Sequence, residues 1–198
     1  MRTDEYKTIS SPSEGTYSEK RSKFLAFALP VENVEQVKEL VQQYQKKYYD
    51  ARHACYAYMI GPERLLFRAN DNGEPSGTAG KPILGQINSN QLTNILIIIV
   101  RYFGGIKLGT SGLIQAYKTA AAEAIANADI IIKTVDEDVS FTFQFQSMNS
   151  VMKIVKELEP TIISQGYDEL CSMTLRIRQS LKTELVSRLS KVDTLLMV

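Results

Sequence analysis

The sequence has few of the residues that metal and disulfide sites require. Its two cysteines, Cys55 and Cys171, lie far apart in segments that read as strands. We therefore expect reduced thiols in the core and no disulfide. The single histidine, His53, has only Cys55 beside it, so a structural zinc site is not expected. A nucleophilic Cys-His pair would in addition need a third group to orient it.

Long apolar segments are also missing. The longest run, residues 95–100, is about a third of the roughly 20 residues that a membrane helix needs, so it predicts a buried strand. No apolar stretch precedes Phe24, and nothing resembles a signal peptide. We expect a cytoplasmic protein with no membrane partner. A net charge of only +1 gives no argument for nucleic-acid binding by the molecule as a whole.

The standard nucleotide-binding motifs are absent. A Walker loop needs Gly-Lys followed by Ser or Thr, whereas Gly80-Lys81 is followed by Pro82. The glycine spacing after Phe103 differs from the dinucleotide fingerprint, and repeated βαβ units are lacking. No cofactor is therefore expected.

The remaining patterns predict an α+β protein of two domains, residues 1–134 and 135–198. The first 20 or so residues are rich in Ser, Thr and charge, which indicates a mobile or edge-lying arm. The spacing of apolar residues and the positions of turn and cap residues then predict strands at residues 23–29, 53–60, 64–69, 94–102 and 130–132. They also predict helices after Asn33, at residues 80–88 and at residues 113–128.

The second domain is predicted to follow the order βαββαβ, the ferredoxin-like plan, in which two helices cover one face of a sheet. Val139, Phe141, Phe143 and Phe145 alternate with polar residues, so we expect a half-buried first strand with these side chains in the core. Two helices, at residues 151–158 and 181–189, and strands at residues 161–165, 170–178 and 195–198 complete the plan. No glycine loop or charged cluster suggests chemistry in this domain.

Two glycine-rich segments, residues 71–80 and 101–113, contain seven of the eleven glycines. Glycine clusters between a strand and a helix often leave backbone amides free to bind an anion, and the helix dipole adds to the attraction. The predicted ligand-binding residues are Glu74, Ser76, Gly77, Thr78 and Lys81 from the first segment, Arg101, Tyr102, Gly104, Gly105, Lys107, Gly109 and Gly112 from the second, and His53. In the alternative interpretation the glycines only permit tight turns.

Two acidic residues of the first segment, Asp71 and Glu74, are the only candidates for a metal site. Hard oxygen ligands of this kind can bind magnesium together with a substrate phosphate. Carboxylates in such loops more often cap turns, and Asn72-Gly73 and Pro75 are ordinary turn residues. Both interpretations stay open from the sequence. Two roles also stay open for His53, that of a general base and that of a polar structural contact.

The same segments resemble the signatures of a known family. Residues 72–80, Asn-Gly-Glu-Pro-Ser-Gly-Thr-Ala-Gly, and residues 101–113, with Arg-Tyr-Phe-Gly-Gly and Leu-Gly-x-x-Gly-Leu, look like motifs of the IMPACT family, in particular of its bacterial, YigZ-type members. His53, Cys55 and Tyr58 resemble a third motif. The resemblance extends over the whole chain, because bacterial members add a small ferredoxin-like domain.

The resemblance implies two folds that are associated with translation. The first domain would share its fold with a small-subunit ribosomal protein and translation-factor domains, and the second would be similar to the last domain of elongation factor G. Eukaryotic relatives regulate translation by competing for the activator of a stress-responsive initiation-factor kinase. Bacteria lack that pathway, so the role does not transfer directly.

Three functions are therefore considered. The favoured one is a protein that binds RNA, the ribosome or a translation-associated protein through Arg101, Lys107, Lys81 and the glycine-rich amides, with Tyr102 and Phe103 available for stacking. The alternative is a metal-dependent hydrolase or phosphoryl-transfer enzyme that uses Asp71 and Glu74. The third is a protein-interaction module built on the ferredoxin-like sheet.

Overall fold

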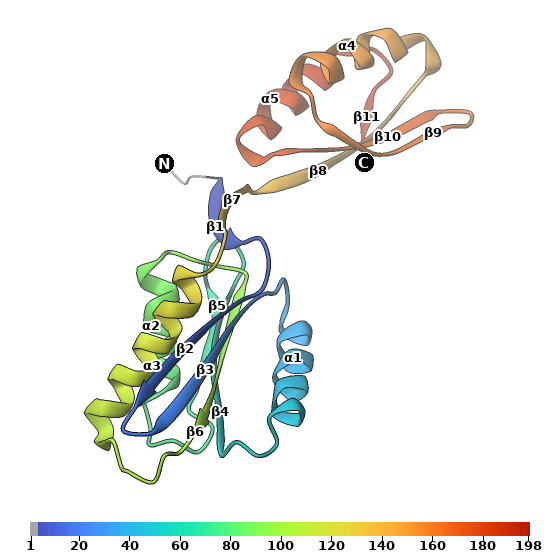
Figure 1. The fold of residues 1–198 in the computed structure, drawn as a ribbon. Coiled ribbons are helices and arrows are strands. Elements are labelled where there is room, and N and C mark those ends of the chain that lie inside the picture. Colours follow the sequence, from blue (N-terminus) through green and yellow to red (C-terminus); the bar gives the residue numbers. More distant parts are fainter. Residues whose placement is uncertain (1–3) are drawn as a thin grey trace. The chain divides into compact units, whose positions relative to one another are not determined.

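The computed structural model of the chain describes residues 4–198 (Figure 1). It contains two compact units, Tyr6–Lys133 and Thr134–Val198, and Asp4 and Glu5 belong with the second. The predicted boundary between residues 134 and 135 lies one residue from this division. The two N-terminal acidic residues, which the sequence assigned to the first domain, are part of the other unit.

The unit Tyr6–Lys133 is built on a five-stranded antiparallel sheet with the strand order β2-β3-β6-β4-β5. Its strands are β2 (Ser13–Glu19), β3 (Ser22–Pro30), β4 (His53–Ile60), β5 (Leu66–Asn70) and β6 (Ile95–Tyr102). The apolar run of β6 lies in the middle of the sheet and is buried, as the sequence predicted.

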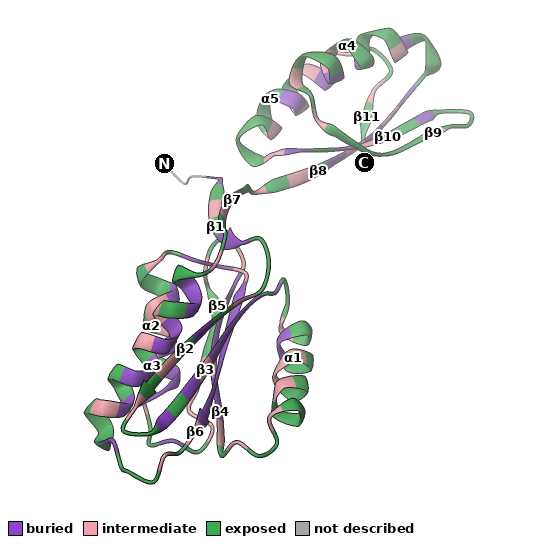
Figure 2. Cartoon of the chain, viewed as in Figure 1, coloured by how far each residue is buried: buried purple, intermediate pink, exposed green. Residues whose placement is uncertain are grey.

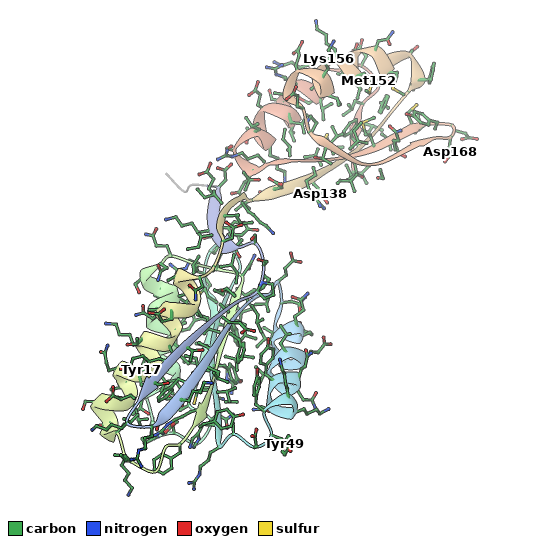
Figure 3. All side chains as sticks on the ribbon, in the orientation of Figure 1. Tyr17, Tyr49, Asp138, Met152, Lys156 and Asp168 are labelled. Carbon is green, nitrogen blue, oxygen red and sulfur yellow. The ribbon has the colours of Figure 1, made fainter. Side chains whose placement is uncertain are left out.

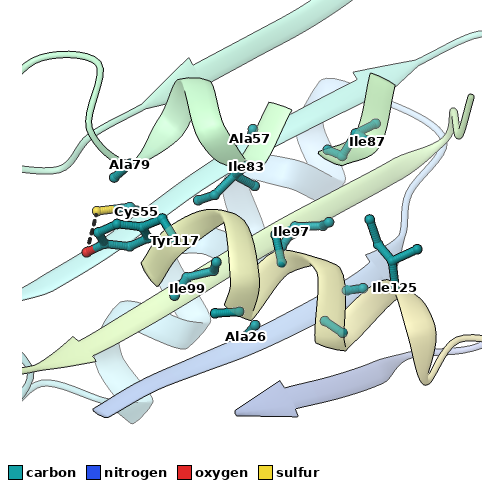
Figure 4. Packing of buried hydrophobic residues seen from close by; sticks show 14 of the residues in the cluster. Ala26, Cys55, Ala57, Ala79, Ile83, Ile87, Ile97, Ile99, Tyr117 and Ile125 are labelled. Carbon is teal, nitrogen blue, oxygen red and sulfur yellow. Dashed lines mark hydrogen bonds between the residues drawn. The ribbon is translucent and has the colours of Figure 1, made fainter. Parts of the chain in front are cut away.

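Helices cover both faces of this sheet (Figures 1 and 2). Alternate side chains of a strand point to opposite faces, so Ile97 and Ile99 pack with α2 (Gly80–Ser89) and α3 (Gly109–Ala126). This cluster is drawn in Figure 4. Leu96 and Ile98 pack on the other face, against α1 (Val34–Lys47). The predicted cap of α1 is confirmed, because Asn33 Oδ1 accepts a hydrogen bond from the Gln36 amide at 2.9 Å.

Two predictions for this unit need correction. The N-terminal arm lies at an edge of the sheet, as one of its two predicted forms, but it contains two strands, β1 (Glu5–Ile9) and β2, before the predicted first strand. β1 pairs with β7 (Ile130–Thr134), and β2 forms an edge of the main sheet. An edge strand has an exposed face, so its Ser, Thr and charged residues resemble those of a loop. Helix α3 begins at Gly109, four residues before the predicted start, so Gly112 lies within its first turn.

The second unit has the predicted order βαββαβ. Its elements are β8 (Asp136–Phe143), α4 (Met148–Leu158), β9 (Thr161–Tyr167), β10 (Cys171–Arg178), α5 (Gln179–Leu189) and β11 (Leu196–Met197), and the sheet order is β11-β8-β10-β9. Phe141 and Phe143 are buried in its core. Phe145 is not, because β8 ends at Phe143 and the ring of Phe145 is 74% exposed. Within residues 4–198, no helix is both long and apolar enough to cross a membrane.

Asp4 belongs with this second unit because its carboxylate binds two groups there. Both oxygens accept hydrogen bonds from the Arg178 guanidinium, at 2.6 and 2.7 Å. One of them also accepts from the backbone amide of Ser180, in the first turn of α5, at 3.0 Å. The bonds from Arg178 and Ser180 hold the pKa of Asp4 well below its usual range. Asp4 is thereby held at the start of α5 within this unit.

The backbone of Gly104 lies very close to the backbone of Arg21. A Cβ atom at this position would lie 2.0 Å from the carbonyl carbon of Arg21, so Gly104→Ala must displace the β2–β3 turn. We expect a loss of about 2 kcal/mol or more in the free energy of unfolding. Gly85→Ala is the matched control, because a Cβ there meets nothing within 4 Å and alanine favours a helix by up to about 1 kcal/mol.

Urea denaturation followed by tyrosine fluorescence measures this difference. Nine of the ten tyrosines lie in the unit Tyr6–Lys133, and the chain has no tryptophan, so the signal reports mainly on that unit. Equal midpoints for the two variants would contradict the contact.

Candidate functional site

A pocket with a volume of about 430 Å³ lies where β4 begins, β6 ends and α3 begins. It is lined by Arg52, His53, Glu74, Pro75, Arg101, Phe103, Lys107, Leu108, Gly109, Thr110 and Leu113. The antiparallel pairing of β4 with β6 places His53 opposite Arg101. This register brings together segments that are about fifty residues apart in the chain.

The wall of the pocket depends on a buried ion pair between Arg101 and Glu74. Arg101 Nη1 donates to Glu74 Oε1 at 2.6 Å, and the two side chains are only 7% and 3% exposed. The same oxygen accepts a hydrogen bond from the Tyr117 hydroxyl at 2.9 Å, and Arg101 Nη2 lies 3.4 Å from Ser22 Oγ. The Nε of Arg101 is buried and has no hydrogen-bond partner within residues 4–198.

Two phenylalanine rings lie against the guanidinium of Arg101. Its Cζ is 5.5 Å from the ring centroid of Phe24 and 5.5 Å from that of Phe103, distances typical of cation–π contacts. Phe24 is fully buried, whereas Phe103 is 47% exposed and lines the pocket. The pocket therefore has an accessible aromatic wall supported by a buried cation.

A buried thiol extends this network beneath the pocket. Cys55 Sγ donates to the Asp71 carbonyl at 2.9 Å and lies 3.3 Å from the Tyr117 hydroxyl (Figure 4). Burial raises the pKa of Cys55 to about 12 and also raises the pKa of Tyr117, so both groups stay protonated at neutral pH. Cys55 and Cys171 are both free and buried, which confirms the prediction of core thiols.

The amides of the first glycine-rich segment are already bound within the chain. The Asp71 carboxylate accepts hydrogen bonds from the backbone amides of Gly77, Ala79 and Gly80, at 2.8, 3.0 and 2.8 Å. Partial burial opposes ionisation of Asp71, but these amides outweigh it and lower the pKa of the carboxyl group. The prediction that Gly77 offers its amide to a ligand is therefore corrected: the loop is a capped turn.

The geometry also separates the two acids that were candidates for a metal site. Asp71 is directed to the loop amides, and Glu74 is directed to Arg101 and Tyr117. In the part of the chain that the structure describes, no three His, Cys, Asp or Glu side chains are grouped as metal ligands. Both carboxylates thus have structural partners, as the turn-capping interpretation requires for Asp71.

Other predicted site residues lie outside the pocket. Thr78 is buried and its hydroxyl donates to the Pro75 carbonyl at 2.7 Å, while Ser76 on the loop and Lys81 in the first turn of α2 are exposed. The Tyr102 side chain points to the opposite face of the sheet from Arg101, since neighbours on a strand alternate. Its hydroxyl donates to Asp50 at 2.9 Å.

The three glycines at 104, 105 and 112 also do not line the pocket. Gly104 and Gly105 form the turn after β6, where the Gly104 amide donates to Ser22 Oγ at 3.2 Å. Gly112 lines a smaller neighbouring hollow together with Tyr17, which is labelled in Figure 3, and Lys20.

Five predicted residues do line the pocket: His53, Glu74, Arg101, Lys107 and Gly109. Within it, His53 Nδ1 donates to the Asn72 carbonyl at 2.8 Å, so the ring holds the capped loop in place. The lining residues that were not predicted are Arg52, Pro75, Leu108, Thr110 and Leu113, and Phe103 was expected only as a stacking partner. The adjacency of Arg52 to His53 was the available signal for the first of these.

The electrostatics of the pocket favour an anion. Its lining carries three cations, Arg52, Arg101 and Lys107, against the single carboxylate Glu74, so its formal charge is +2 with His53 neutral. Because Arg101 is paired with Glu74, the excess comes from Arg52 and Lys107, which are exposed. The first residues of α3 also line the pocket, and no side chain caps this helix. The positive end of the helix dipole therefore adds to the attraction.

Comparisons with known proteins place the pocket in a shared domain. The model of the Impact N-terminal domain matches residues 20–125, which include all the lining residues. IMPACT family member YvyE of Bacillus subtilis is 36% identical over 126 residues, or 64% of this chain and 58% of that protein. IMPACT family member YigZ of Escherichia coli is 29% identical over 175 residues, or 86% and 85% of the two chains.

The likeness extends to solved structures. A crystal structure of a hypothetical protein aligns with 99% of this chain and 97% of its own, with a TM-score of 0.76 and 26% identity. The α+β fold with two sheet-containing parts is thus shared over the whole chain, in agreement with the expected resemblance.

The buried network predicts an unreactive thiol. With its pKa raised to about 12, Cys55 forms thiolate only in strong alkali, so native protein incubated with iodoacetamide at pH 8 should remain unmodified at this residue. Peptide mass spectrometry of native and urea-unfolded samples measures the labelling, and the unfolded sample should be labelled fully. Rapid labelling of Cys55 in the native protein would contradict the described burial.

Proposed function

This chain belongs to the IMPACT family, and from that premise we propose that it is a binding protein that contacts RNA phosphates beside the pocket. Five exposed cations gather there, which we name the basic end: Lys20, Arg21, Lys23, Arg52 and Lys107. The observation that carries the proposal is this local excess of positive charge in a chain whose net charge is only +1. Phosphate contacts by Lys and Arg dominate the affinity of proteins for nucleic acids.

The fold gathers these cations from three separate segments. The backbone of Arg21 touches Gly104, and Lys23 lies opposite Tyr102 on β6. Lys20 lines the hollow beside the pocket. Arg52 precedes β4 and Lys107 precedes α3, and both line the pocket itself. The segments lie at one end of the strands because β3 and β4 both start where their antiparallel neighbour β6 ends.

Few acidic residues oppose the basic end. Glu19 and Asp50 are the carboxylates of the same turns, and they accept hydrogen bonds from the Tyr17 and Tyr102 hydroxyls. Five cations against these two carboxylates leave a local charge of about +3 at neutral pH. An exposed Phe103 in the same region supplies a surface for base stacking, which is how proteins commonly hold single-stranded RNA.

We place this binding in translation, with the ribosome or a translation-associated RNA as the partner, because the family resemblance points there. The competing idea of a metal-dependent hydrolase has less support. Its two carboxylates, Asp71 and Glu74, are engaged by the loop amides and by Arg101 and Tyr117. Neither acid presents a free pair of oxygens to a shared ion.

A salt series tests the proposal. Binding of a fluorescein-labelled single-stranded RNA decamer, measured by anisotropy, should weaken as salt rises. Arg52→Ala and Lys107→Ala should each lower the slope of log K against log salt by about 0.7, the value per phosphate contact on a single strand. Lys156→Ala, at an exposed lysine of α4 in the other unit, is the matched control and should change nothing.

Arg101 is left intact in this test, because its removal would leave the Glu74 charge buried and destabilise the fold by about 3–5 kcal/mol. Binding that does not respond to salt, or that falls equally in the Lys156→Ala control, would contradict the proposal.

The link to translation has its own measurement. Wild-type protein should co-sediment with ribosomes at low salt, and the double variant Arg52→Ala/Lys107→Ala should not. The Lys156→Ala control should sediment as the wild type does. Co-sedimentation that persists in the double variant would show that the ribosome does not bind through the basic end.

A further inference from the structure

The size of the pocket limits what it can hold. Its volume of about 430 Å³ is near the lower end of the roughly 300–1,000 Å³ that small-molecule sites occupy. Such a space fits one nucleotide and excludes a run of several. The walls then decide which part of a nucleic acid enters it.

One wall suits a flat apolar group. It is formed by Phe103 with Pro75, Leu108 and Leu113. The ring of Phe103 is 47% exposed although it contacts the guanidinium of Arg101, so it is held in place and still accessible. Aromatic side chains of this kind stack on nucleobases. A bare phosphate or a phosphorylated serine would leave this wall unused.

The start of α3, in contrast to the apolar wall, suits a negatively charged group. Gly109 and Thr110, in its uncapped first turn, line the pocket together with the exposed cations Arg52 and Lys107. A terminal phosphate carries a charge of about −1.5 to −2 at pH 7 and offers three acceptor oxygens. An internal phosphodiester carries only one negative charge. The two unbalanced cations and the helix end match the terminal group better.

A second, independent feature of the pocket points to a ligand. Among the described residues that line it, Arg101 has a side chain only 7% exposed and a buried Nε without a hydrogen-bond partner. Buried donors without partners are rare in folded proteins, because each costs about 1–3 kcal/mol. Nη1 donates to Glu74 and Nη2 lies 3.4 Å from Ser22 Oγ, so Nε is the nitrogen of this group that has no partner within residues 4–198.

We infer that the pocket binds one nucleotide with a terminal phosphate, so that the protein recognises the phosphorylated end of an RNA strand. The base stacks on Phe103, and the phosphate lies at the start of α3 between Arg52 and Lys107. This inference rests on the proposed function, since the basic end supplies the contacts to the rest of the strand. It adds a preference for strand ends that phosphate contacts alone do not require.

Four short RNAs test the inference with the full chain at fixed salt. The first is a tetranucleotide with a 5′-phosphate, and the second is the same strand with a 5′-hydroxyl. The third keeps the 5′-phosphate but lacks the terminal base, and the fourth carries the phosphate at its 3′ end. Each has a fluorescein on the opposite end, and affinity is measured by anisotropy. We expect either the 5′-phosphorylated or the 3′-phosphorylated strand to bind about tenfold more tightly than the hydroxyl strand. The strand that lacks the terminal base should lose this gain in affinity.

Variants at the aromatic wall assign the effect to the pocket. Phe103→Ala should weaken binding of the phosphorylated strand by at least about 5-fold, because stacking of one base is worth about 1–3 kcal/mol. Phe103→Leu keeps an apolar side chain without a ring and should lose most of the same affinity. Phe145→Ala is the control, since that ring is 74% exposed in the other unit.

Each outcome separates the two proposals. Equal affinity for phosphate and hydroxyl ends, with salt-dependent binding retained, overturns the inference and leaves the proposed function in place. The absence of any salt-dependent RNA binding removes both. A phosphoserine peptide that competes as well as the phosphorylated strand, with no effect of Phe103→Ala, would assign the pocket to a phosphoprotein and also overturn the inference.

Discussion

The buried ion pair between Arg101 and Glu74 organises the functional end of the first unit. Arg101 ends the central strand, and Glu74 belongs to the loop between β5 and α2. Tyr117 of α3 and Ser22 of β3 bind the same pair. Four elements that are distant in sequence therefore meet at one charged contact. A buried pair of this kind contributes little net stability, but losing one partner costs about 3–5 kcal/mol, so it fixes the arrangement of the elements around it.

This contact explains why the glycine-rich motifs have two different roles. The loop of residues 71–80 has a structural role. Asp71 binds its amides, and Gly80 lies so close to Asn70 that a Cβ on Gly80 would be 2.5 Å from the backbone nitrogen of Asn70. The second segment supplies the surface that a ligand can reach. Lys107, Gly109 and Thr110 line the pocket at the uncapped start of α3. This loop holds Glu74 in place, and the ion pair with Glu74 holds Arg101 beside the start of α3.

The sequence predicted the parts of the fold that repeat a strong local pattern. The apolar run of β6, the Asn33 cap of α1 and the βαββαβ order of the second unit all follow from spacing that a single segment carries. It missed β1 and β2, whose composition is that of exposed edges. It also kept Phe145 in the core, because alternation continues beyond the residue at which the strand ends.

The site was harder to predict because its residues meet only through strand register. Arg101 and Tyr102 are equal candidates in sequence, yet alternation on β6 directs one to the pocket and the other to α1. Arg52 enters the site because β4 is paired to β6 in one particular register. Whether loop amides are free or bound depends on a single side chain, Asp71. The expected likeness of the two units to ribosomal-protein and elongation-factor domains stays a prediction.

The most direct measurement is a titration of ¹⁵N-labelled full-length protein with a 5′-phosphorylated dinucleotide, followed by NMR. If the start of α3 is the anion site, the amides of Gly109 and Thr110 and the Nε–H of Arg101 should show the largest shift changes. The amides of Gly77 and Gly80, held by Asp71, should stay nearly unchanged. The largest changes at Gly77 and Gly80, or at residues of the second unit only, would contradict the account.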